Sequence, residues 1–228
     1  MNINVGQSIL HLNDEQSLAN RRRFDERGLV CVNVLASPGA GKTSVIIRLA
    51  EAMRNRGLAV GVIEGDVAAS IDTDKLRSLG FAAEQINTDG GCHLDAAMVA
   101  RAAERLDVRG PGFVFIENIG NLICPTQFHL GETLRLVVAS APEGDDKPVK
   151  YPAVFESADA VVLNKIDLLE HVDFRLDFFI AAVRTTNPYA PIFHVSARRC
   201  EGIDALVEWC LVVKKCTLTL HSPTRSGR

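Results

Sequence analysis

Residues 36–43, Ala-Ser-Pro-Gly-Ala-Gly-Lys-Thr, have the residue types and spacing of a loop that binds phosphate groups. They fit the pattern G-x-x-x-x-G-K-[ST] except at the first position, where Ala36 stands for glycine. In such a loop the backbone N–H groups surround a phosphate, the Lys42 ammonium neutralises phosphate oxygens, and the Thr43 hydroxyl ligates Mg²⁺. A simple glycine turn would not require the Lys-Thr pair, so the sequence predicts a nucleotide-binding loop. The residues expected to contact the nucleotide here are Gly39, Ala40, Gly41, Lys42, Thr43 and Ser44.

A second motif indicates which base the nucleotide carries. Residues 164–167 have the form N-K-x-D, and Asp167 would accept hydrogen bonds from guanine N1–H and from its 2-amino group. Adenine would leave this carboxylate unpaired. Residues 196–198, Ser-Ala-Arg, resemble the last guanine-binding motif of G proteins, and the order of the three motifs is that of a GTPase. The candidate base-binding residues are Asn164, Lys165, Asp167, Ser196, Ala197 and Arg198.

Acidic residues at two expected strand ends could complete the site with a magnesium ion and an oriented water. Asp66 follows the second expected strand, and Glu117 ends the third. Glu117 and Gly120 stand where G proteins usually have D-x-x-G, so the carboxylate is kept. A solvated loop position is the alternative for both acids, and solvation is the better interpretation for Asp72 and Asp74. The expected catalytic residues are Lys42, Asp66 and Glu117, and the expected Mg²⁺ ligands are Thr43, Asp66 and Glu117.

A third group of residues has the chemistry of a metal site. Cys92 and His93 are adjacent, and Cys124 lies seven residues after Glu117. Thiolate and imidazole suit both Zn²⁺ and Ni²⁺. Seven residues span at most ~25 Å, so Cys124 must lie in the neighbourhood of the nucleotide. The segment from Glu117 to Cys124 could therefore change its conformation when a γ-phosphate is present. Three protein ligands are one short of a closed tetrahedral site, which leaves the fourth position to water or to a second chain.

Ordinary packing is the alternative for these residues, because single cysteines are often buried as small hydrophobic side chains. His129, five residues after Cys124, is a weaker ligand candidate. Cys31 lies within an expected core strand, where packing explains it. The cysteines without ligand spacing, expected to be inert, are Cys200, Cys210 and Cys216.

Short apolar runs that alternate with helical segments must position these motifs. They predict an α/β fold with a mostly parallel, doubly wound sheet. The expected strands are 29–36, 57–64, 112–117, 134–140, 160–164 and 191–196. A helix is expected from 13 to 27, with Asn13 or Asp14 as its N-cap, Gly28 as its stop, and Leu18 and Phe24 as a thin apolar stripe. Residues 43–55 are expected to be helical and 141–152 to form a surface loop.

The composition places these elements in one domain with short appendages. The 228 residues are 47% hydrophobic and 23% charged with a net charge of −3, which excludes a disordered chain and does not favour nucleic acid as a partner. Six cysteines, no signal peptide and no apolar run near 18 residues indicate a reducing compartment, hence the cytoplasm, without a membrane anchor. The expected divisions are a helical extension at 1–28, a nucleotide domain at 29–212 and a frayed tail at 213–228.

With these motifs the chain resembles the HypB family, the nickel-incorporation GTPases of [NiFe]-hydrogenase maturation, over about residues 12–209. The segments that carry the resemblance are LNDEQSLANRRRFDERGLVCVN, SPGAGKT, VIEGDVAAS, GCHLDA, IENIGNLICP, APEGDDKPVKYP and VVLNKIDLL. The resemblance implies a P-loop NTPase fold of the SIMIBI type that hydrolyses GTP slowly, with GTP/GDP, Mg²⁺ and Ni²⁺ or Zn²⁺ as cofactors. It also implies a homodimer whose inter-subunit metal site uses Cys92, His93 and Cys124. The implied partners are a zinc-binding nickel-donor protein and the hydrogenase large-subunit precursor.

Departures from the family bear on how far the resemblance reaches. Many relatives have cysteines or a histidine-rich tract near the N-terminus, whereas residues 1–30 have only His11, so we expect dependence on a separate nickel donor. The family often has T-G-K-G-C-H-L where this chain has Asp89 and Gly90 in place of Gly-Lys, which removes a positive charge beside the ligands. Ser37 occupies the signature lysine position of the MinD-type ATPases. A chaperone GTPase for urease or a cobalamin enzyme, and a non-catalytic zinc or partner-binding module, are the alternatives.

Overall fold

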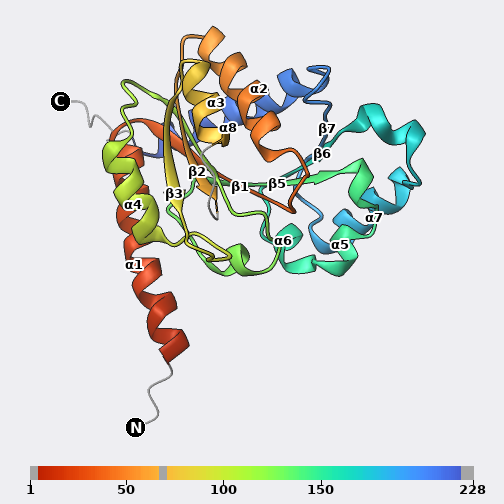
Figure 1. Ribbon diagram of the computed structural model, residues 1–228, viewed down its shortest axis with the longest axis horizontal. Helices are drawn as coiled ribbons and strands as arrows, with labels where there is room; N and C mark the ends of the chain where they lie inside the picture. The colour runs from red at the N-terminus through yellow and green to blue at the C-terminus, as the bar shows by residue number, and fades with distance from the viewer. Residues whose placement is uncertain (1–4, 67–70, 222–228) are drawn as a thin grey trace, which may run out of the picture.

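A seven-stranded, all-parallel sheet forms the centre of the molecule (Figure 1). The computed structural model describes residues 5–66 and 71–221. The strand order is β3-β2-β4-β1-β5-β6-β7, which confirms the doubly wound P-loop fold. The strands are β1 (Leu29–Ala36), β2 (Ala59–Asp66), β3 (Ala82–Asn87), β4 (Gly112–Glu117), β5 (Leu134–Ser140), β6 (Ala160–Asn164) and β7 (Ile192–His194).

Strand β3 is absent from the sequence prediction. It lies at the edge of the sheet and carries Glu84 and Gln85, which are only partly buried. Its apolar residues are therefore too few and too interrupted to resemble the buried strands. The central strands β1, β4 and β5 are buried along their whole length, and the apolar runs did predict them.

Helices cover both faces of the sheet. One hydrophobic cluster joins one face to α2 (Lys42–Asn55), α3 (Ile71–Ser78) and α8 (Ile203–His221). Two clusters on the other face involve α1 (Val5–Glu26), α4 (Ala96–Arg105), α6 (Pro152–Glu156) and α7 (Leu176–Thr186). Helices α1 and α4 lie side by side (Figure 1). None of the helices within residues 5–66 and 71–221 combines the length and apolar character that crossing a bilayer requires.

Helix α1 differs from the helix expected from the sequence. It begins at Val5, and Asn13 is a buried residue in its interior instead of the N-cap. The Asn13 side chain bonds to neighbouring segments, which is why it does not cap. Phe24 is fully buried, but Leu18 is 61% exposed and does not belong to the apolar stripe. Gly28 has a φ of 67°, as expected for a residue that ends a helix.

Two other segments are more ordered than the sequence predicts. Residues 141–152 form the 3-10 turn η2 (Ala141–Glu143), the short helix α5 (Lys147–Lys150) and the start of α6, instead of a loop. Each begins with a proline in its first turn, where the missing N–H costs nothing. Helix α8 continues to His221, past the expected domain end at 212, and within it Lys214 is buried and donates to the carbonyls of Gly28 and Gly112.

In a parallel sheet of this kind, ligands bind at the carboxyl ends of the strands. The carboxyl ends of β1, β2, β3, β4, β6 and β7, and the loops that leave them, carry the nucleotide and metal motifs described above. The remaining short elements, η1 (Cys124–Gln127) and η3 (Ile166–His171), follow β4 and β6 at this same edge.

Candidate nucleotide and metal-ligand sites

The phosphate loop joins β1 to α2 and turns on two glycines. Gly39 and Gly41 have φ values of 80° and 94°, in the left-handed region that favours glycine. A Cβ atom on Gly41 would also lie 2.5 Å from Nδ2 of Asn164. Helix α2 begins at Lys42, so its unpaired N–H groups face the loop and favour a bound anion. The loop therefore has the shape and polarity of a phosphate site.

Thr43 connects the phosphate loop to two acidic residues from other elements. Its Oγ1 lies 2.9 Å from Oε1 of Glu117 at the end of β4, and 3.2 Å from Oδ2 of Asp72 in the first turn of α3. The interpretation of Asp72 as a solvated acid is therefore wrong. Asp74 is the solvated one, 64% exposed and 3.8 Å from Arg77.

The carboxyl group of Glu117 is held in an environment that disfavours its charge. Burial raises its pKa to about 7, although the Lys42 charge and the Thr43 hydroxyl act in the opposite direction. One oxygen, Oε2, is buried and has no hydrogen-bond partner in the described part of the chain. A cation at this atom would satisfy it, and carboxylate and hydroxyl oxygens are the ligands that Mg²⁺ prefers. The residues present thus fit a magnesium ion.

Asp66 and Glu64 line the same cavity from β2. The cavity has a volume of about 660 Å³ and also contains Lys42, Thr43 and Gly120. Glu64 was not among the residues predicted to form the site. It is 3% exposed, accepts a 2.9 Å hydrogen bond from Thr73, and lies opposite Glu117 in the strand register.

Burial raises the pKa of Glu64 to about 7, which the Thr73 hydrogen bond only partly opposes. The sequence contained a signal for it, since Glu64 is the one charged residue in the expected strand 57–64. Burying a charge is costly, so a carboxyl group at the end of a buried strand is expected to be hydrogen-bonded, paired with a charge or bound to a metal ion.

The N-K-x-D segment bonds directly to the phosphate loop. Asn164 Nδ2 donates to the Ala40 carbonyl at 2.9 Å, and its Oδ1 accepts from the Ala197 amide at 3.2 Å. Lys165 has a φ of 59° and its Nζ lies 2.6 Å from the Gly39 carbonyl. Three motifs far apart in the sequence are thereby brought into one hydrogen-bonded unit.

Asp167 lies at the far end of this unit. Ser196 donates a 2.6 Å hydrogen bond to its Oδ1, which holds the pKa of the carboxyl group below its usual value and keeps it ionised. Asp167 lines a cavity of about 570 Å³ together with Asn164, Ala197 and Arg198. This volume is in the range of small-molecule sites.

The two cavities adjoin at the phosphate loop. Gly41, Ser44 and Lys165 line both of them. A nucleotide could therefore extend from Asp167 at one end to Thr43 and Glu117 at the other, with its phosphates over the loop.

The candidate metal ligands Cys92, His93 and Cys124 lie in the loops that follow β3 and β4. The Cys124 thiol interacts with the Cys92 thiol and raises its pKa, and Cys92 Sγ is 3.6 Å from His93 Nδ1. The His93 ring stacks on Phe128, with centroids 3.9 Å apart. Within residues 5–66 and 71–221, however, no three histidine, cysteine or acidic side chains converge as a metal ion requires. Metal binding by these residues thus stays a prediction, and so does its completion by a second chain.

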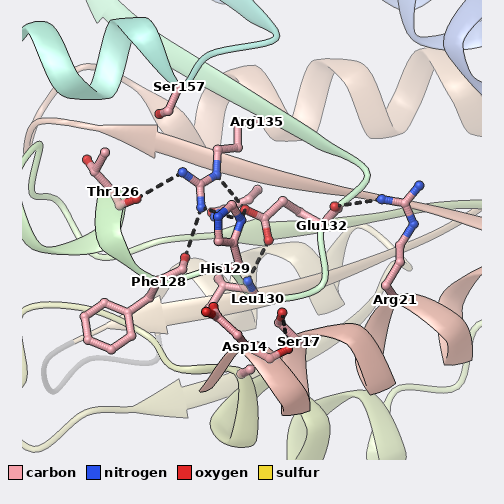
Figure 2. A network of polar contacts seen from close by, with 12 residues as sticks. Asp14, Ser17, Arg21, Thr126, Phe128, His129, Leu130, Glu132, Arg135 and Ser157 are labelled. Carbon is pink, nitrogen blue, oxygen red and sulfur yellow. Dashed lines mark hydrogen bonds and ion pairs between the residues drawn. The ribbon is translucent and has the colours of Figure 1, made fainter. Parts of the chain in front are cut away.

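The remaining thiols and His129 have other surroundings. His129 Nδ1 is 3.1 Å from Nη2 of Arg135 and 3.7 Å from Oε1 of Glu132, so its ring belongs to a polar network with these two residues (Figure 2). Cys31 and Cys210 are fully buried, and burial raises the pKa of both thiols, that of Cys210 to about 12. Packing accounts for these two cysteines. The exposed pair is Cys200 and Cys216.

Comparison with known proteins agrees with this arrangement. The nucleotide-binding domain family of CobW, HypB and UreG matches residues 30–194. The hydrogenase maturation factor HypB of Rhizobium leguminosarum bv. viciae is 46% identical over 91% of this chain and 69% of its own length. The crystal structure of HypB from Helicobacter pylori in complex with nickel has a TM-score of 0.84 at 35% identity, over 90% of this chain and 96% of that one. HypB from Archaeoglobus fulgidus gives a TM-score of 0.82 at 35% identity, over 90% and 99%.

Proposed function

We propose, on the premise that this chain belongs to the HypB family of hydrogenase maturation factors, that it hydrolyses GTP and delivers nickel to the [NiFe]-hydrogenase large-subunit precursor. One observation carries the proposal. Two cavities meet across the phosphate loop, one ending at Asp167 and the other at Thr43 and Glu117. This layout suits a guanine nucleotide whose base and γ-phosphate lie at opposite ends.

Guanine recognition would depend on Asp167. Its carboxylate, kept ionised by Ser196, would accept from guanine N1–H and the 2-amino group. Asn164 would act indirectly, because its amide is used to hold Ala40 and Ala197. Adenine presents an acceptor at N1 and has no amino group there, so it would leave the Asp167 charge unpaired.

The triphosphate would lie on the loop, where Lys42 neutralises the β- and γ-phosphate oxygens. Thr43, Asp66 and Glu117 would hold Mg²⁺, and Asp72 joins them because it contacts Thr43. When bound, Mg²⁺ supplies positive charge that stabilises the phosphate oxygens during transfer.

Asp66 at the end of β2 and Gly120 in the loop after β4 would act on the attacking water and the γ-phosphate. Asp66, in the same cavity, would orient the attacking water. The Gly120 N–H would detect the γ-phosphate, since Gly120 packs closely enough on the phosphate loop that an added Cβ would lie 3.1 Å from the Cα of Pro38.

Nickel is the cargo in this proposal, and Cys92, His93 and Cys124 are its ligands. Support comes from the 3.6 Å distance between Cys92 Sγ and His93 Nδ1, from the interaction of the Cys124 thiol with the Cys92 thiol, and from the solved nickel complex of the Helicobacter pylori relative. A second copy of the chain would supply the missing ligands across a two-fold axis, which makes the protein a homodimer. Zn²⁺ can occupy the same ligand set. A zinc-binding nickel donor would load the site in the cytoplasm, without nucleic acid or a membrane anchor.

Nucleotide and metal would be linked through the six residues between Glu117 and Cys124. If GTP and nickel bias one conformational equilibrium, each changes the affinity for the other by the same factor. Nickel affinity, measured by competition with a chelator, should therefore differ between the GDP-bound and GTP-analogue-bound protein. Identical affinities would contradict the linkage.

Phosphate release tests the enzymatic part, with Lys42→Ala as the control. GTP that binds but is never hydrolysed above this control would support a binding module instead. Hydrogenase activity in a strain lacking the gene tests the delivery. Restored activity upon return of the gene, or upon addition of excess nickel, is expected, and failure of the gene to restore activity would refute the assignment.

A further inference from the structure

Two buried asparagines on α1 each join the two segments that carry the thiol and imidazole cluster. Asn13 and Asn20 are seven residues apart, two helical turns, so they lie on one face of the helix. They are 7% and 2% exposed. Their amides face the start of α4 and the loop that follows η1, and each amide bonds to both.

The hydrogen bonds of the two asparagines converge on the same backbone positions. Asn13 accepts from the Ala96 N–H at 2.8 Å and donates to the His129 carbonyl at 2.8 Å. Asn20 donates to the Ala96 carbonyl at 2.7 Å and to the Leu130 carbonyl at 3.0 Å. Ala96 therefore has both backbone groups held by α1.

These positions adjoin the candidate ligands along the chain. Ala96 follows His93 by three residues, and His129 follows Cys124 by five. The backbone that follows each group of candidate ligands is thus hydrogen-bonded to the same helix, α1. Direct contacts between the segments include the stack of His93 on Phe128, at half-buried positions, and the exposed 3.4 Å bond from Asn121 to the Cys92 carbonyl. Water competes with contacts of that kind, whereas a buried amide keeps its bonds.

A buried ion pair holds the Cys124 segment from the other side (Figure 2). Arg135 donates to the carbonyls of Thr126 at 3.0 Å and Phe128 at 3.2 Å, and to Glu132 Oε1 at 2.6 Å. Glu132 Oε2 accepts from the Leu130 N–H at 2.6 Å. The loop between η1 and β5 is therefore fixed along its length, and α1 sets its distance from α4.

Helix α1 approaches this loop so closely that one position admits only glycine. Gly131 has a φ of 95°, and a Cβ atom there would lie 2.5 Å from the Asn20 Cβ and 2.7 Å from the Ser17 carbonyl oxygen. The helix and the loop thus have a defined separation, which a metal site needs because its ligands must be placed within a fraction of an ångström.

We propose that Asn13 and Asn20 are positioning residues for the metal site: they set the separation of the segment with Cys92 and His93 from the segment with Cys124. This inference rests on the proposed function, because it takes those three side chains as the ligands. The asparagines touch no metal and act only through the backbone of Ala96, His129 and Leu130. Groups that hydrogen-bond directly to metal ligands typically change metal affinity about 10- to 100-fold when they are replaced, and we expect a loss in this range for the two asparagines.

The test uses the purified full chain with Co²⁺ and Ni²⁺ as probes. Asn13→Ala and Asn20→Ala should each weaken binding of both ions about 10- to 100-fold and alter the thiolate-to-metal charge-transfer band. The KM and kcat for GTP in the absence of these ions should stay within about twofold of the original, because neither asparagine lines the nucleotide cavities. A purely structural loss would lower thermal stability without changing the spectrum of the bound metal.

Asn187→Ala is the matched control. The Asn187 amide donates to the carbonyls of Phe155, Glu156 and Ala158, near α6, α7 and β7 at the far end of the sheet. Its replacement removes a comparable bridge and should lower the melting temperature while the metal affinity and spectrum stay unchanged.

Three results distinguish failure of the positioning role from failure of the metal site itself. Folded Asn13→Ala and Asn20→Ala proteins with the original affinity and spectrum would overturn the positioning role. If Cys92→Ala and Cys124→Ala bind both ions as the original chain does, the metal site itself is refuted. Should the alanine variants not fold, Asn13→Asp retains the acceptor for Ala96 but places a carboxylate oxygen against the His129 carbonyl in place of the donor. The same loss of affinity is expected for it, and unchanged binding would overturn the role.

Discussion

The Thr43 hydroxyl donates a 2.9 Å hydrogen bond to Oε1 of Glu117, which links the phosphate loop to the carboxyl end of the neighbouring strand β4. Glu117 also begins the segment that reaches Cys124 seven residues later. A ligand that binds the Thr43 hydroxyl and breaks this hydrogen bond would therefore change the surroundings of Glu117. Glu117 is the residue at which the segment leading to Cys124 begins.

Glu117→Gln should abolish most of the GTP hydrolysis. The amide keeps the size of the side chain but removes the negative charge proposed to hold Mg²⁺, and the loss of a group of this kind costs about 100-fold or more in kcat. GDP binding without Mg²⁺ should change little. Steady-state phosphate release at several Mg²⁺ concentrations measures both effects. Asp74→Asn, at an exposed acid on α3, is the control that should hydrolyse GTP normally, and equal rates for the two variants would contradict the role of Glu117.

Asp167→Asn should shift the base preference from GTP towards xanthosine triphosphate. The asparagine amide can donate to the 2-oxo group of xanthine, whereas the Asp167 carboxylate accepts from guanine. Sites that hydrogen-bond a substrate in this way discriminate by about 10⁴-fold, so the GTP preference should fall by about that order. Competition binding with both nucleotides measures the shift, and the exposed Asp177→Asn on α7 serves as control. Undiminished GTP binding would disprove the base assignment.

Gly41→Ala should impair nucleotide binding more than backbone strain alone explains. The alanine would adopt a φ of 94° and place its Cβ 2.5 Å from the Asn164 amide nitrogen, which would separate the phosphate loop from the N-K-x-D segment. Gly57→Ala is the matched control, because Gly57 has a φ of 76° but nothing within 4 Å of the added atom. Strain of about 1–3 kcal/mol is expected in both, measured by chemical denaturation. Only Gly41→Ala should lose GTP affinity, and a normal affinity would count against this packing.

Glu132→Gln should destabilise the fold near neutral pH and lose this effect in acid. Burial by itself would raise the pKa of Glu132, but a hydrogen bond from His129 and the charge and hydrogen bond of Arg135 outweigh it and lower the pKa to about 2. The ordinary value is 4.5, so the folded state favours the carboxylate by about 3 kcal/mol. Because the folded pKa is depressed, this stability is fully present above pH 4.5 and is lost as the pH falls towards 2.

Urea denaturation of the two proteins from pH 7 to pH 3 measures this dependence. The difference in the free energy of unfolding should be largest at pH 7, where the glutamine variant leaves Arg135 buried without its counter-charge. A difference that does not shrink on acidification would show that the ion pair is not its source.

Local motifs account for what could be predicted at the site. The phosphate loop and N-K-x-D each depend on a few consecutive residues, and the chemistry of phosphate and guanine dictates those residues. The apolar runs of β1, β4 and β5 also predicted these strands, because strands buried on both faces of a sheet are apolar over nearly their whole length. Strand β3 was not predicted, because a strand at the edge of a sheet does not have to be apolar throughout.

Contacts between distant residues account for what could not be predicted. Asp72 looked like any acid on a helix surface until the placement of α3 brought it within 3.2 Å of Thr43. Asn13 looked like an N-cap because asparagine favours that position, yet the helix begins at Val5. Its partners Ala96 and His129 are 83 and 116 residues away, and no local pattern identifies them.

The sequence by itself determined the fold class, the nucleotide motifs and the presence of two thiols and an imidazole with ligand chemistry. These follow from short-range residue identity and periodicity, which act within a few residues. Only the tertiary structure decided that Asp72 and Glu64 share the cavity of Glu117, and that α1 holds both ligand segments. Such relationships depend on how helices and loops pack around the sheet, because a hydrogen bond between distant residues exists only when packing brings donor and acceptor to within about 3 Å.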